Sequence, residues 1–363
     1  MKKIIFTVTN DLTYDQRMQR ICTSLVSAGY LVELVGRKFS TSPSLIDTNY
    51  VQKRLNCWFK RGKFFYFEYN IRLFLFLLFT RADCICAIDL DTIIPCWVVS
   101  KLKGIKRVYD AHEYFSQLYE VVSRPTIYQL WHWIEKKMIP RFKNGYTVCQ
   151  SIADEFSKEH GVVYEVIRNV PVLNELKISL GNEKIILYQG AVNKGRDLDK
   201  LAESMKSVDA ELWIYGNGNY MAEMKRVVEK NNITDKVKFF GMLSPSELKS
   251  KITQAYLAVN LFGRKGLNQY LSLANKFFDY IHAGIPQVTM NYPEYQKINQ
   301  QYEIAILIDD TDPAEIAGAI NKLLNDQMLY KRLKENCLKA REELNWQKEE
   351  RKLISFYRNL FNE

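Results

Sequence analysis

Residues 184–190 read KIILYQG, an apolar run that ends in a glycine, and residues 197–208 read DLDKLAESMKSV. The first pattern is typical of a buried strand and the second of an amphipathic helix. Strand-like and helix-like segments already alternate through the preceding half of the chain, so the pattern starts again at residue 184. This restart predicts two α/β domains within one chain.

Further strands are predicted on both sides of this stretch, most of them followed by a helix-like segment. In the first half they cover residues 4–9, 31–36, 84–89, 107–112 and 146–150. In the second half they cover residues 184–190, 211–218, 236–241, 257–262, 286–290 and 305–308. Such alternation produces parallel, doubly wound sheets that bind ligands at the carboxyl ends of their strands. We therefore expect two Rossmann-like domains that face a central cleft.

The boundary between the domains is predicted within EVIRNVPVLNELKISLGN, residues 165–182, where a proline lies among polar residues. It divides the chain into a first domain at 1–170 and a second domain at 171–340. Residues 341–363 are predicted to end the chain in a helix. The apolar side of that helix is formed by Trp346, Leu353, Ile354, Tyr357 and Leu360.

The composition is that of a globular protein without a disulfide framework. Hydrophobic residues make up 47% of the chain and charged residues 25%. The opening MKKIIFTVT has an apolar run too short for a secretory signal. The seven cysteines are scattered, and Cys84 and Cys86 alternate in a predicted strand rather than at a zinc-ligand spacing. These features predict buried thiols in the reducing cytoplasm and no metal site.

Most of the net charge of +10 lies in the first 110 residues, which carry +8. KRLNCWFKRGKFFYF at 53–67 contains five cations, no acid and six aromatic residues, and IRLFLFLLF follows at 71–79. That apolar run is far shorter than the about 20 residues needed to span a bilayer. We interpret residues 53–79 as a peripheral docking surface for the anionic inner face of the cell membrane. A buried helix beside a solvated loop is the alternative. Nucleic-acid binding is disfavoured, because no such motif accompanies the charge.

SLANKFFDYIHAGIP, residues 272–286, predicts a short helix with an unusual first turn. Asn275 is a candidate N-cap, and Gly284 and Pro286 end the helix. Its inward-facing residues are predicted to be Phe277, Phe278, Ile281 and His282. Lys276 puts a cation at the positive end of the helix dipole, where anions are preferred. This placement indicates a strongly anionic ligand at the helix end.

Three glycine-containing turns follow strands of the second half: QGAVNKGRD, YGNGNY and FGMLSPSEL. None has the G-x-G-x-x-G pattern and no P-loop occurs, so a dinucleotide oxidoreductase has little support. Gly190 lets the backbone approach a ligand, and Lys194 and Arg196 bring two cations to the first turn. By itself this turn fits a solvated surface loop equally well. Together with Lys276 it predicts a clamp for a diphosphate.

YDAHEYF, residues 109–115, ends a predicted strand of the first half with a histidine at the carboxyl edge of the sheet. His112 can there donate a hydrogen bond to an anion or orient a hydroxyl group. A structural histidine is the alternative. His132 and His160 lie in helical segments without an evident partner, and we interpret both as structural.

The layout resembles the bacterial-type GT-B glycosyltransferases of family four, which are retaining and use nucleotide sugars. SLANKFFDYIHAGIP is similar to the acid-containing helix of the family and its Ala-Gly-x-Pro ending. Further similar stretches are YQGAVNKGRDLDKL, LWIYGNG, VKFFGMLSPSEL and the histidine strand YDAHEYF. The helix that contains Trp346 resembles the one that crosses back onto the first domain. The resemblance covers essentially the whole chain and implies the GT-B fold.

The resemblance implies that the first domain binds the acceptor and the second the nucleotide sugar. His112, Arg196 and Lys276 are implied to be catalytic, with the two cations on the leaving diphosphate. Asp279 stands where a family glutamate holds the ribose hydroxyls. The other donor-binding residues are implied to be Gly190, Lys194, Gly216, Gly218, Met242 and Asn275.

Three places depart from the family. Leu271 occupies the position of the first family glutamate, whose role then falls to a neighbour. The candidate neighbours are Asn268, Ser272 and Asn275. Ala191 follows the glycine of the first turn where many relatives carry arginine, and Arg196 is the predicted substitute. NDLTYDQR replaces the glycine-rich loop of the first domain, and Asp15 and Arg17 within it are predicted to line the acceptor side.

The implied reaction moves a sugar from a UDP- or GDP-linked donor to a lipid-linked or saccharide acceptor, in the synthesis of a cell-surface polysaccharide or glycoconjugate. Besides that donor the resemblance implies no cofactor and no required metal. The backbone at 239–243 is expected to contact the base. A catalytically silent nucleotide-sugar-binding protein is the alternative, indicated by Leu271 and by the altered first turn. A NAD-dependent enzyme is a third and weaker possibility.

Overall fold

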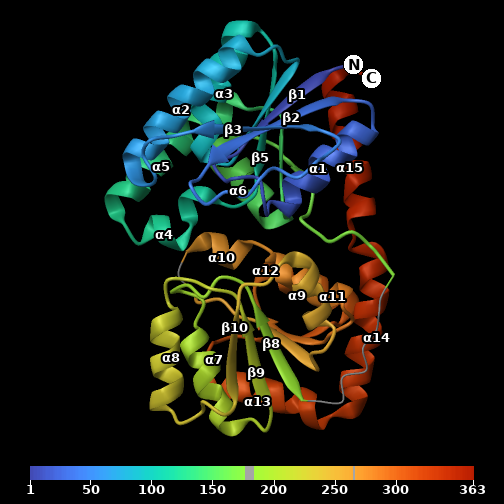
Figure 1. Cartoon of the computed structure of the whole chain (residues 1–363). Helices are drawn as coiled ribbons and strands as arrows, with labels where there is room; N and C mark the ends of the chain where they lie inside the picture. Colours follow the sequence, from blue (N-terminus) through green and yellow to red (C-terminus); the bar gives the residue numbers. More distant parts are fainter. Residues whose placement is uncertain (176–183, 265) are drawn as a thin grey trace. The chain divides into compact units, whose positions relative to one another are not determined.

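A computed structural model of the chain describes residues 1–175, 184–264 and 266–363. They form two compact units, each with its own parallel sheet (Figure 1). Unit 1 contains residues 1–169 and 348–363, and unit 2 contains residues 170–347. The first change of unit falls inside the predicted linker, whose residues 176–182 lie outside the described residues.

Unit 1 is built on a sheet with the strand order β3-β2-β1-β4-β5-β6-β7. These strands are β1 (Lys3–Thr7), β2 (Leu31–Lys38), β3 (Val51–Asn56), β4 (Cys84–Ile88), β5 (Lys106–Ala111), β6 (Gly145–Thr147) and β7 (Glu165–Val166). Strand β4 is buried along its whole length, as expected for a parallel strand covered on both faces. The strand order reverses between β1 and β4, and ligands bind most often at such a switch point.

Helices connect these strands. They are α1 (Gln16–Ser27), α2 (Gly62–Phe79), α3 (Ile93–Lys103), α4 (Tyr119–Val122), α5 (Pro125–Met138) and α6 (Gln150–His160), with short 3-10 turns η1 (Leu90–Thr92), η2 (Phe115–Gln117) and η3 (Ile139–Arg141). The last helix, α15 (Trp346–Phe361), packs on β1, where the Phe6 and Tyr357 rings lie 6.1 Å apart. The Tyr30 hydroxyl donates to Glu363 at 2.9 Å, and Figure 1 draws α15 in red.

Unit 2 repeats the architecture with the strand order β10-β9-β8-β11-β12-β13. These strands are β8 (Ile185–Gln189), β9 (Glu211–Tyr215), β10 (Val237–Gly241), β11 (Leu257–Asn260), β12 (Gln287–Met290) and β13 (Ala305–Ile308). The helices are α7 (Leu198–Ser204), η4 (Met205–Ser207), α8 (Met221–Lys230), α9 (Pro245–Ile252), α10 (Leu267–Leu271), α11 (Asn275–His282), α12 (Pro293–Tyr302), α13 (Pro313–Asn325) and α14 (Gln327–Glu343). The switch point of this sheet lies between β8 and β11.

The predicted class of two parallel α/β domains is confirmed, and every predicted strand overlaps an observed one. Strand β3 was not predicted, because VQKRLN is polar and partly exposed at the sheet edge. The two-residue strand β7 is too short to leave a pattern. Gln150 was predicted to end a strand, and instead it begins helix α6.

Helix α11 has the predicted inward face but a different cap. Phe277, Phe278, Ile281 and His282 are all buried, as predicted. The N-cap is Ala274, whose backbone is extended, and Asn275 is the first helical residue with an exposed side chain. The prediction that Asn275 caps the helix is therefore wrong. Gly284 has φ +68°, the left-handed conformation that glycine commonly supplies at a helix end.

The seven cysteines all lie within the described residues and are free thiols. Six are buried, as predicted, and Cys57 is half-buried. Within the described ranges, no helix is both long enough and apolar enough to cross a bilayer.

Candidate active site

Lys276, in the first turn of α11, is a buried cation that is only 8% exposed. Its ammonium lies 3.9 Å from the centre of the Tyr188 ring and 5.1 Å from that of Phe262. Nζ forms no hydrogen bond with any described residue. Burial, together with the nearby Arg196 guanidinium, holds the pKa of Lys276 well below its usual value. An unpaired charge costs several kcal/mol to bury, so the site favours an anion.

The loop after β8 brings a second cation and open space to this ammonium. The Arg196 guanidinium lies 4.7 Å from the centre of the same Phe262 ring. Gly190 has φ +128°, and a Cβ added to it would lie 3.7 Å from Lys276 Nζ. Any larger residue there would strain the backbone and occupy the space beside the ammonium. Two cations and this open backbone therefore meet at the switch point of the second sheet.

Asp279 lies about one turn after Lys276 on α11 and is half-buried. Its carboxylate accepts a hydrogen bond from Gln189 Nε2 at 2.6 Å. The backbone N–H of Gln189, the last residue of β8, donates to the Tyr280 hydroxyl at 3.1 Å. These two bonds fix the carboxylate at the carboxyl end of β8. Leu271 ends α10 and is buried, so its position presents an apolar side chain.

The possible substitutes for the missing glutamate differ in exposure. Asn268 is buried, Ser272 is half-buried and Asn275 is exposed. Lys194 and Met242, also predicted to contact the donor, are exposed in the loops after β8 and β10. Exposure leaves the side chains of Lys194, Met242 and Asn275 accessible to a ligand.

Gly216 and Gly218 allow two loops to pack closely against each other. A Cβ at residue 216 would lie 1.9 Å from the carbonyl oxygen of Gly190, and one at residue 218 would lie 2.2 Å from that of Val192. Only glycine permits this approach of the β8 and β9 loops. The structure thus gives these glycines a packing role, and their contact with a donor stays a prediction.

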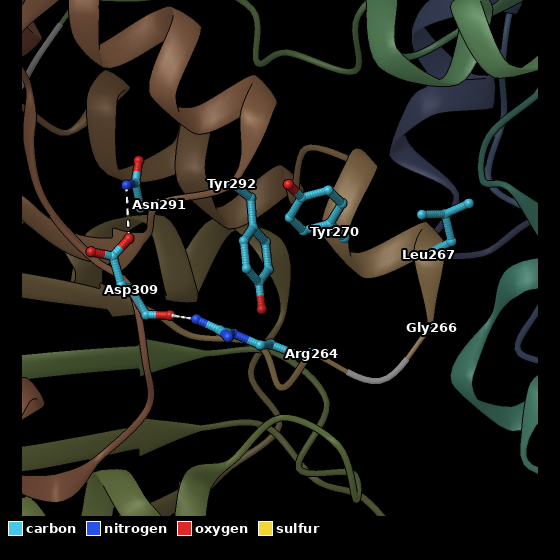
Figure 2. A pocket seen from close by; sticks show the side chains of 7 residues that line it. All are labelled: Arg264, Gly266, Leu267, Tyr270, Asn291, Tyr292 and Asp309. Carbon is cyan, nitrogen blue, oxygen red and sulfur yellow. Dashed lines mark hydrogen bonds between the residues drawn. The ribbon is translucent and has the colours of Figure 1, made fainter.

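A pocket of about 510 Å³ opens at the carboxyl ends of β11, β12 and β13 (Figure 2). Its volume falls in the range of about 300–1,000 Å³ typical of small-molecule sites. The pocket is lined by Arg264, Gly266, Leu267, Tyr270, Asn291, Tyr292 and Asp309. The rings of Tyr270 and Tyr292 meet edge to face, 5.0 Å apart, and Tyr270 is 42% exposed. One side of the pocket is therefore aromatic.

Polar groups gather at the other side of this pocket. Asn291 Nδ2 donates to the Asp309 carboxylate at 2.8 Å, and Arg264 donates to the Asp309 backbone carbonyl (Figure 2). The buried Oδ1 of Asn291 has no partner among the described residues. The Tyr292 hydroxyl donates to the carbonyl oxygen of Phe262 at 2.9 Å. The pocket is thus next to Phe262, whose ring lies near both the Lys276 ammonium and the Arg196 guanidinium.

Sequence reasoning did not single out these pocket residues. A signal was present, because Asn291 and Asp309 directly follow β12 and β13, and Arg264 follows β11 within four residues. Polar residues at the carboxyl ends of parallel strands are candidates for ligand contact. The motif-based search passed over them because they form no known pattern.

In unit 1, His112 belongs to a buried ion-pair network. Asp110, at the end of β5, accepts hydrogen bonds from His112 Nε2 at 3.0 Å and from Arg17 at 2.9 Å. Burial opposes the charge of Asp110, but Arg17 and His112 outweigh it and lower the pKa of Asp110. Burial likewise opposes the charge of His112, but Asp110 outweighs it and raises the pKa of His112. The His112 side chain stays 19% exposed, so the ring is held in place and still reaches the surface.

The two residues predicted for the acceptor side have partners within the fold. Arg17 is 3% exposed, and besides Asp110 it donates to the carbonyl oxygen of Ile167 at 3.0 Å. Asp15 caps α1 by accepting from the Met18 backbone N–H at 3.0 Å. The prediction that Arg17 lines the acceptor surface is corrected, because its guanidinium is buried and already bonded to Asp110 and Ile167. Arg17 instead positions Asp110 and, through it, His112.

His132 and His160 both lie near Glu135 in unit 1, with the His160 side chain buried and the His132 side chain 39% exposed. His160 Nε2 lies 3.4 Å from Glu135 Oε1, and His132 Nδ1 lies 3.8 Å from it. Glu135 is 1% exposed, which fits the structural role predicted for both histidines. In the part of the chain that the structure describes, no group of three or more His, Cys, Asp or Glu side chains could hold a metal ion.

Comparison with known proteins places this geometry in context. A family model described as "Glycosyl transferases group 1" matches residues 176–340. A search of curated protein sequences returned no match. Among solved structures, sucrose-phosphate synthase from Thermosynechococcus elongatus is 17% identical and superposes with a TM-score of 0.85 over 100% of both chains.

Two further structures are similar over nearly the whole chain. HepE from Anabaena, in complex with UDP-glucose, has a TM-score of 0.76 at 12% identity, covering 99% of this chain and 100% of HepE. WaaG, a glycosyltransferase involved in lipopolysaccharide biosynthesis, has a TM-score of 0.75 at 14% identity, covering 97% and 98%. At such identities the structures show the fold alone, and that fold is GT-B. With the family model, they confirm the predicted resemblance and support glycosyltransferase activity.

Proposed function

We propose that the protein is a retaining glycosyltransferase that moves a sugar from a nucleotide-diphosphate sugar to a lipid-linked or saccharide acceptor, in the synthesis of a cell-surface polysaccharide or glycoconjugate. One observation carries the donor half of this proposal: the buried Lys276 ammonium has no counter-ion among the described residues. A diphosphate supplies the missing negative charge, and Arg196 provides a second positive one.

The same arrangement suits the chemical step. When the bond between the anomeric carbon and the diphosphate oxygen breaks, the electron pair stays on the departing oxygen. Lys276 and Arg196 stabilise that charge in a site where little water weakens the interaction. Gly190 leaves room for the phosphates, and we propose that Asp279, held by Gln189, binds the ribose hydroxyls. These interactions strengthen as charge develops, which is the condition for faster reaction.

We propose that the transferred sugar occupies the pocket at β11, β12 and β13, because Phe262 joins that pocket to the two cations. A sugar ring offers hydroxyl groups to Arg264, Asn291 and Asp309 and an apolar face to Tyr270. For His112, in unit 1, we propose the role that the resemblance implies, which is to steer the sugar or assist the departing group. The resemblance also implies turnover without a metal, and activity that persists in EDTA is the expected result.

Thermal unfolding with UDP, GDP, ADP and their sugars tests the donor half. UDP-glucose is the first candidate, since HepE was solved with it. A ligand at about 100 times its Kd stabilises the native state by about 2.7 kcal/mol. We expect Lys276→Met to abolish the rise in Tm. Lys225→Met, which removes an exposed cation of α8, is expected to keep it. If no nucleotide raised the Tm, or if Lys276→Met responded like the wild type, the donor site would be misassigned.

A catalytically silent nucleotide-sugar-binding protein remains the second candidate, because the buried Leu271 replaces an expected carboxylate. Both candidates bind the donor, and only the enzyme consumes it. Release of nucleoside diphosphate from a nucleotide sugar that stabilises the protein, measured with a membrane extract as acceptor source, separates the two. Binding without release across the donor panel would favour the silent protein.

Helix α2 supports the proposal that the protein docks on the inner face of the cell membrane. One face of this helix is buried against unit 1. The other face is an exposed apolar stripe formed by Phe64, Phe67, Ile71, Leu75 and Phe79. Trp58, just before the helix, is 84% exposed, and cations surround the start of the helix. Helix α5 lies beside α2 and adds exposed Leu130 and Trp133, with the rings of Tyr66 and Trp131 5.4 Å apart (Figure 1).

Vesicle flotation tests the membrane proposal. Each basic residue near an anionic leaflet contributes about 1 kcal/mol, so the five cations of 53–63 give salt-sensitive binding. We expect the wild type to float with anionic but not neutral vesicles, and a variant with these five residues changed to Gln to float much less. The five are Lys53, Arg54, Lys60, Arg61 and Lys63. Equal flotation of both proteins, or none of either, would show that this surface is not the anchor.

A further inference from the structure

A second pocket lies in unit 1, at the carboxyl ends of β2 and β3. It has a volume of about 260 Å³ and is lined by Arg37, Lys38, Phe39, Ser40, Asn56, Cys57 and Lys60. Three of these residues are cations, and none carries a carboxylate. A hollow lined by charge of one sign concentrates ligands of the opposite sign.

Arg37, in the wall of this pocket, is a buried cation that is 5% exposed. Its guanidinium donates to the carbonyl oxygens of Phe59 at 3.1 Å and Lys60 at 2.6 Å, and lies 3.7 Å from the centre of the Phe65 ring. Nε has no hydrogen-bond partner among the described residues. Burial lowers the pKa of Arg37. Its direct contacts are therefore carbonyl oxygens and a ring, while the Glu68 carboxylate opposes the effect of burial on its pKa.

Two acids near this region are already engaged, since Asp11 accepts from Ser42 and Glu68 holds the loop before α2. Glu68 accepts from the backbone N–H groups of Trp58 and Phe59, each at 2.9 Å, and pairs with Arg72 at 2.8 Å. Its carboxylate thus holds the loop before α2 and neutralises a different cation. No carboxylate lines the pocket itself, so its cations can attract an anionic ligand.

The pocket also contains neutral donors and a loop held in place. Ser40 and Asn56 can donate to anionic oxygens, as the exposed Lys38 and Lys60 can. The two hydrogen bonds from Arg37 tie the loop that carries Cys57 and Lys60 to the end of β2. A set of donors around one small hollow matches a phosphoryl group, which offers several acceptor oxygens and up to two negative charges.

We propose that this pocket binds a phosphoryl group, and that the group belongs to a lipid-linked acceptor. The second part rests on the proposed function. Lys60 lies in the pocket wall, and the apolar stripe of α2 begins four residues later at Phe64. A lipid whose phosphate occupies the pocket can therefore lay its chain along a surface that is already apolar. A soluble phosphate would make no use of that stripe.

Cys57 provides a local test on the full-length protein, because it lines the pocket while the other six thiols are buried. We expect inorganic pyrophosphate at about ten times its Kd to slow maleimide modification of Cys57 about tenfold, since only the unoccupied pocket reacts. Sodium chloride at the same ionic strength should protect far less. Equal protection by chloride would overturn the proposal. The measurement needs no nucleotide sugar and no turnover, so its failure is distinct from failure of the proposed function.

Matched pairs of variants test whether pyrophosphate protects Cys57 by binding in this pocket. Lys38→Gln with Lys60→Gln removes two pocket cations, and we expect the protection by pyrophosphate to disappear. Lys53→Gln with Lys63→Gln removes two nearby cations outside the pocket and should keep the protection. Each variant is compared with itself in the absence of pyrophosphate, because cations also affect the thiol. Equal loss in both variants would mean that general charge, not the pocket, binds the anion.

Vesicles separate the two sources of the phosphoryl group. Phosphatidic acid exposes a phosphate monoester, and phosphatidylglycerol at matched surface charge exposes only a diester. We expect vesicles with phosphatidic acid to protect Cys57 more strongly than those with phosphatidylglycerol, and Lys38→Gln with Lys60→Gln to remove the difference. Protection by pyrophosphate and glucose 6-phosphate but not by phosphatidic acid would overturn the assignment to a lipid.

Discussion

Two of the buried cations, Arg17 in unit 1 and Lys276 in unit 2, differ in whether a carboxylate neutralises them. Arg17 in unit 1 is 3% exposed and donates to the Asp110 carboxylate at 2.9 Å. Lys276 in unit 2 is 8% exposed and has the rings of Tyr188 and Phe262 beside its ammonium. Both charges are removed from water, but only the first has a counter-ion in the described chain.

The difference shows that the partner of a buried charge, rather than its burial, indicates its role. A cation over a ring gains about 2 kcal/mol or more in a dry site, whereas burying an unpaired ion costs several kcal/mol. Lys276 is therefore unsatisfied until an anion binds, and Arg17 is satisfied by the fold. The first arrangement suits a binding site, and the second suits a structural support for His112.

The largest expected effect comes from removing the satisfied charge. Arg17→Met leaves the Asp110 carboxylate buried with only His112 as partner, and we expect a loss of about 3–5 kcal/mol in the free energy of unfolding. Urea denaturation measures this loss. Arg226→Met, which breaks an exposed ion pair with Glu223, should cost less than about 1 kcal/mol. Similar losses in both variants would show that the buried pair of Arg17 and Asp110 stabilises the fold no more than an exposed ion pair does.

Removing the charge of Lys276 should affect activity rather than stability. We expect Lys276→Met to leave the free energy of unfolding without ligand unchanged or slightly higher, because a costly buried charge becomes an apolar group. The same variant should lose about 2–4 kcal/mol of transition-state stabilisation, seen as a fall in kcat/KM. Arg196→Ala should show a comparable fall. A Lys276→Met variant that unfolds, or one with wild-type kcat/KM, would contradict the assignment.

Proton uptake sharpens the comparison further. The pKa of Lys276 is held well below its usual value in the free protein, and a bound diphosphate raises it. Binding of UDP should therefore take up protons, to at most about one per site, when the pH lies between the two pKa values. Its affinity should fall as the pH rises above the pKa of the free protein. Calorimetry in buffers of different ionisation enthalpy measures the uptake, and Lys276→Met should abolish it.

The smallest expected effect concerns His112. Asp110 raises the pKa of His112 above its ordinary value of 6.5. The interaction of protonated His112 with Asp110 therefore stabilises the folded protein fully below about pH 6.5. This contribution to the free energy of unfolding is lost as the pH rises through the pKa of His112 in the folded state. The free energy of unfolding of the wild type should decline across this range relative to His112→Gln. Identical slopes for the two proteins in urea denaturation would show that the contact with Asp110 does not stabilise the charged ring.

Local patterns were sufficient to predict most of the architecture. Buried parallel strands require continuous apolar runs, and KIILYQG at 184–190 is such a run with a glycine at its end. Strand β3 was not predicted, because it lies at the sheet edge, where polar residues are tolerated and the apolar pattern of a buried strand is absent. The N-cap of α11 was misplaced by one residue, because the exact start of a helix depends on the backbone that precedes it.

The sequence by itself determined the two-domain fold and indicated Lys276 as a binding residue. Both the spacing of apolar residues and a cation at the start of a helix can be recognised within a short stretch of the chain. Only the tertiary structure decided which charges are paired. Arg17 and Asp110 are 93 residues apart, and strand order brings them into contact. Lys276 meets Tyr188 and Phe262 in the same way, and its ammonium bonds to no carboxylate of the described chain. Charge pairing and pocket shape depend on which distant strands become neighbours, and no local pattern contains that information.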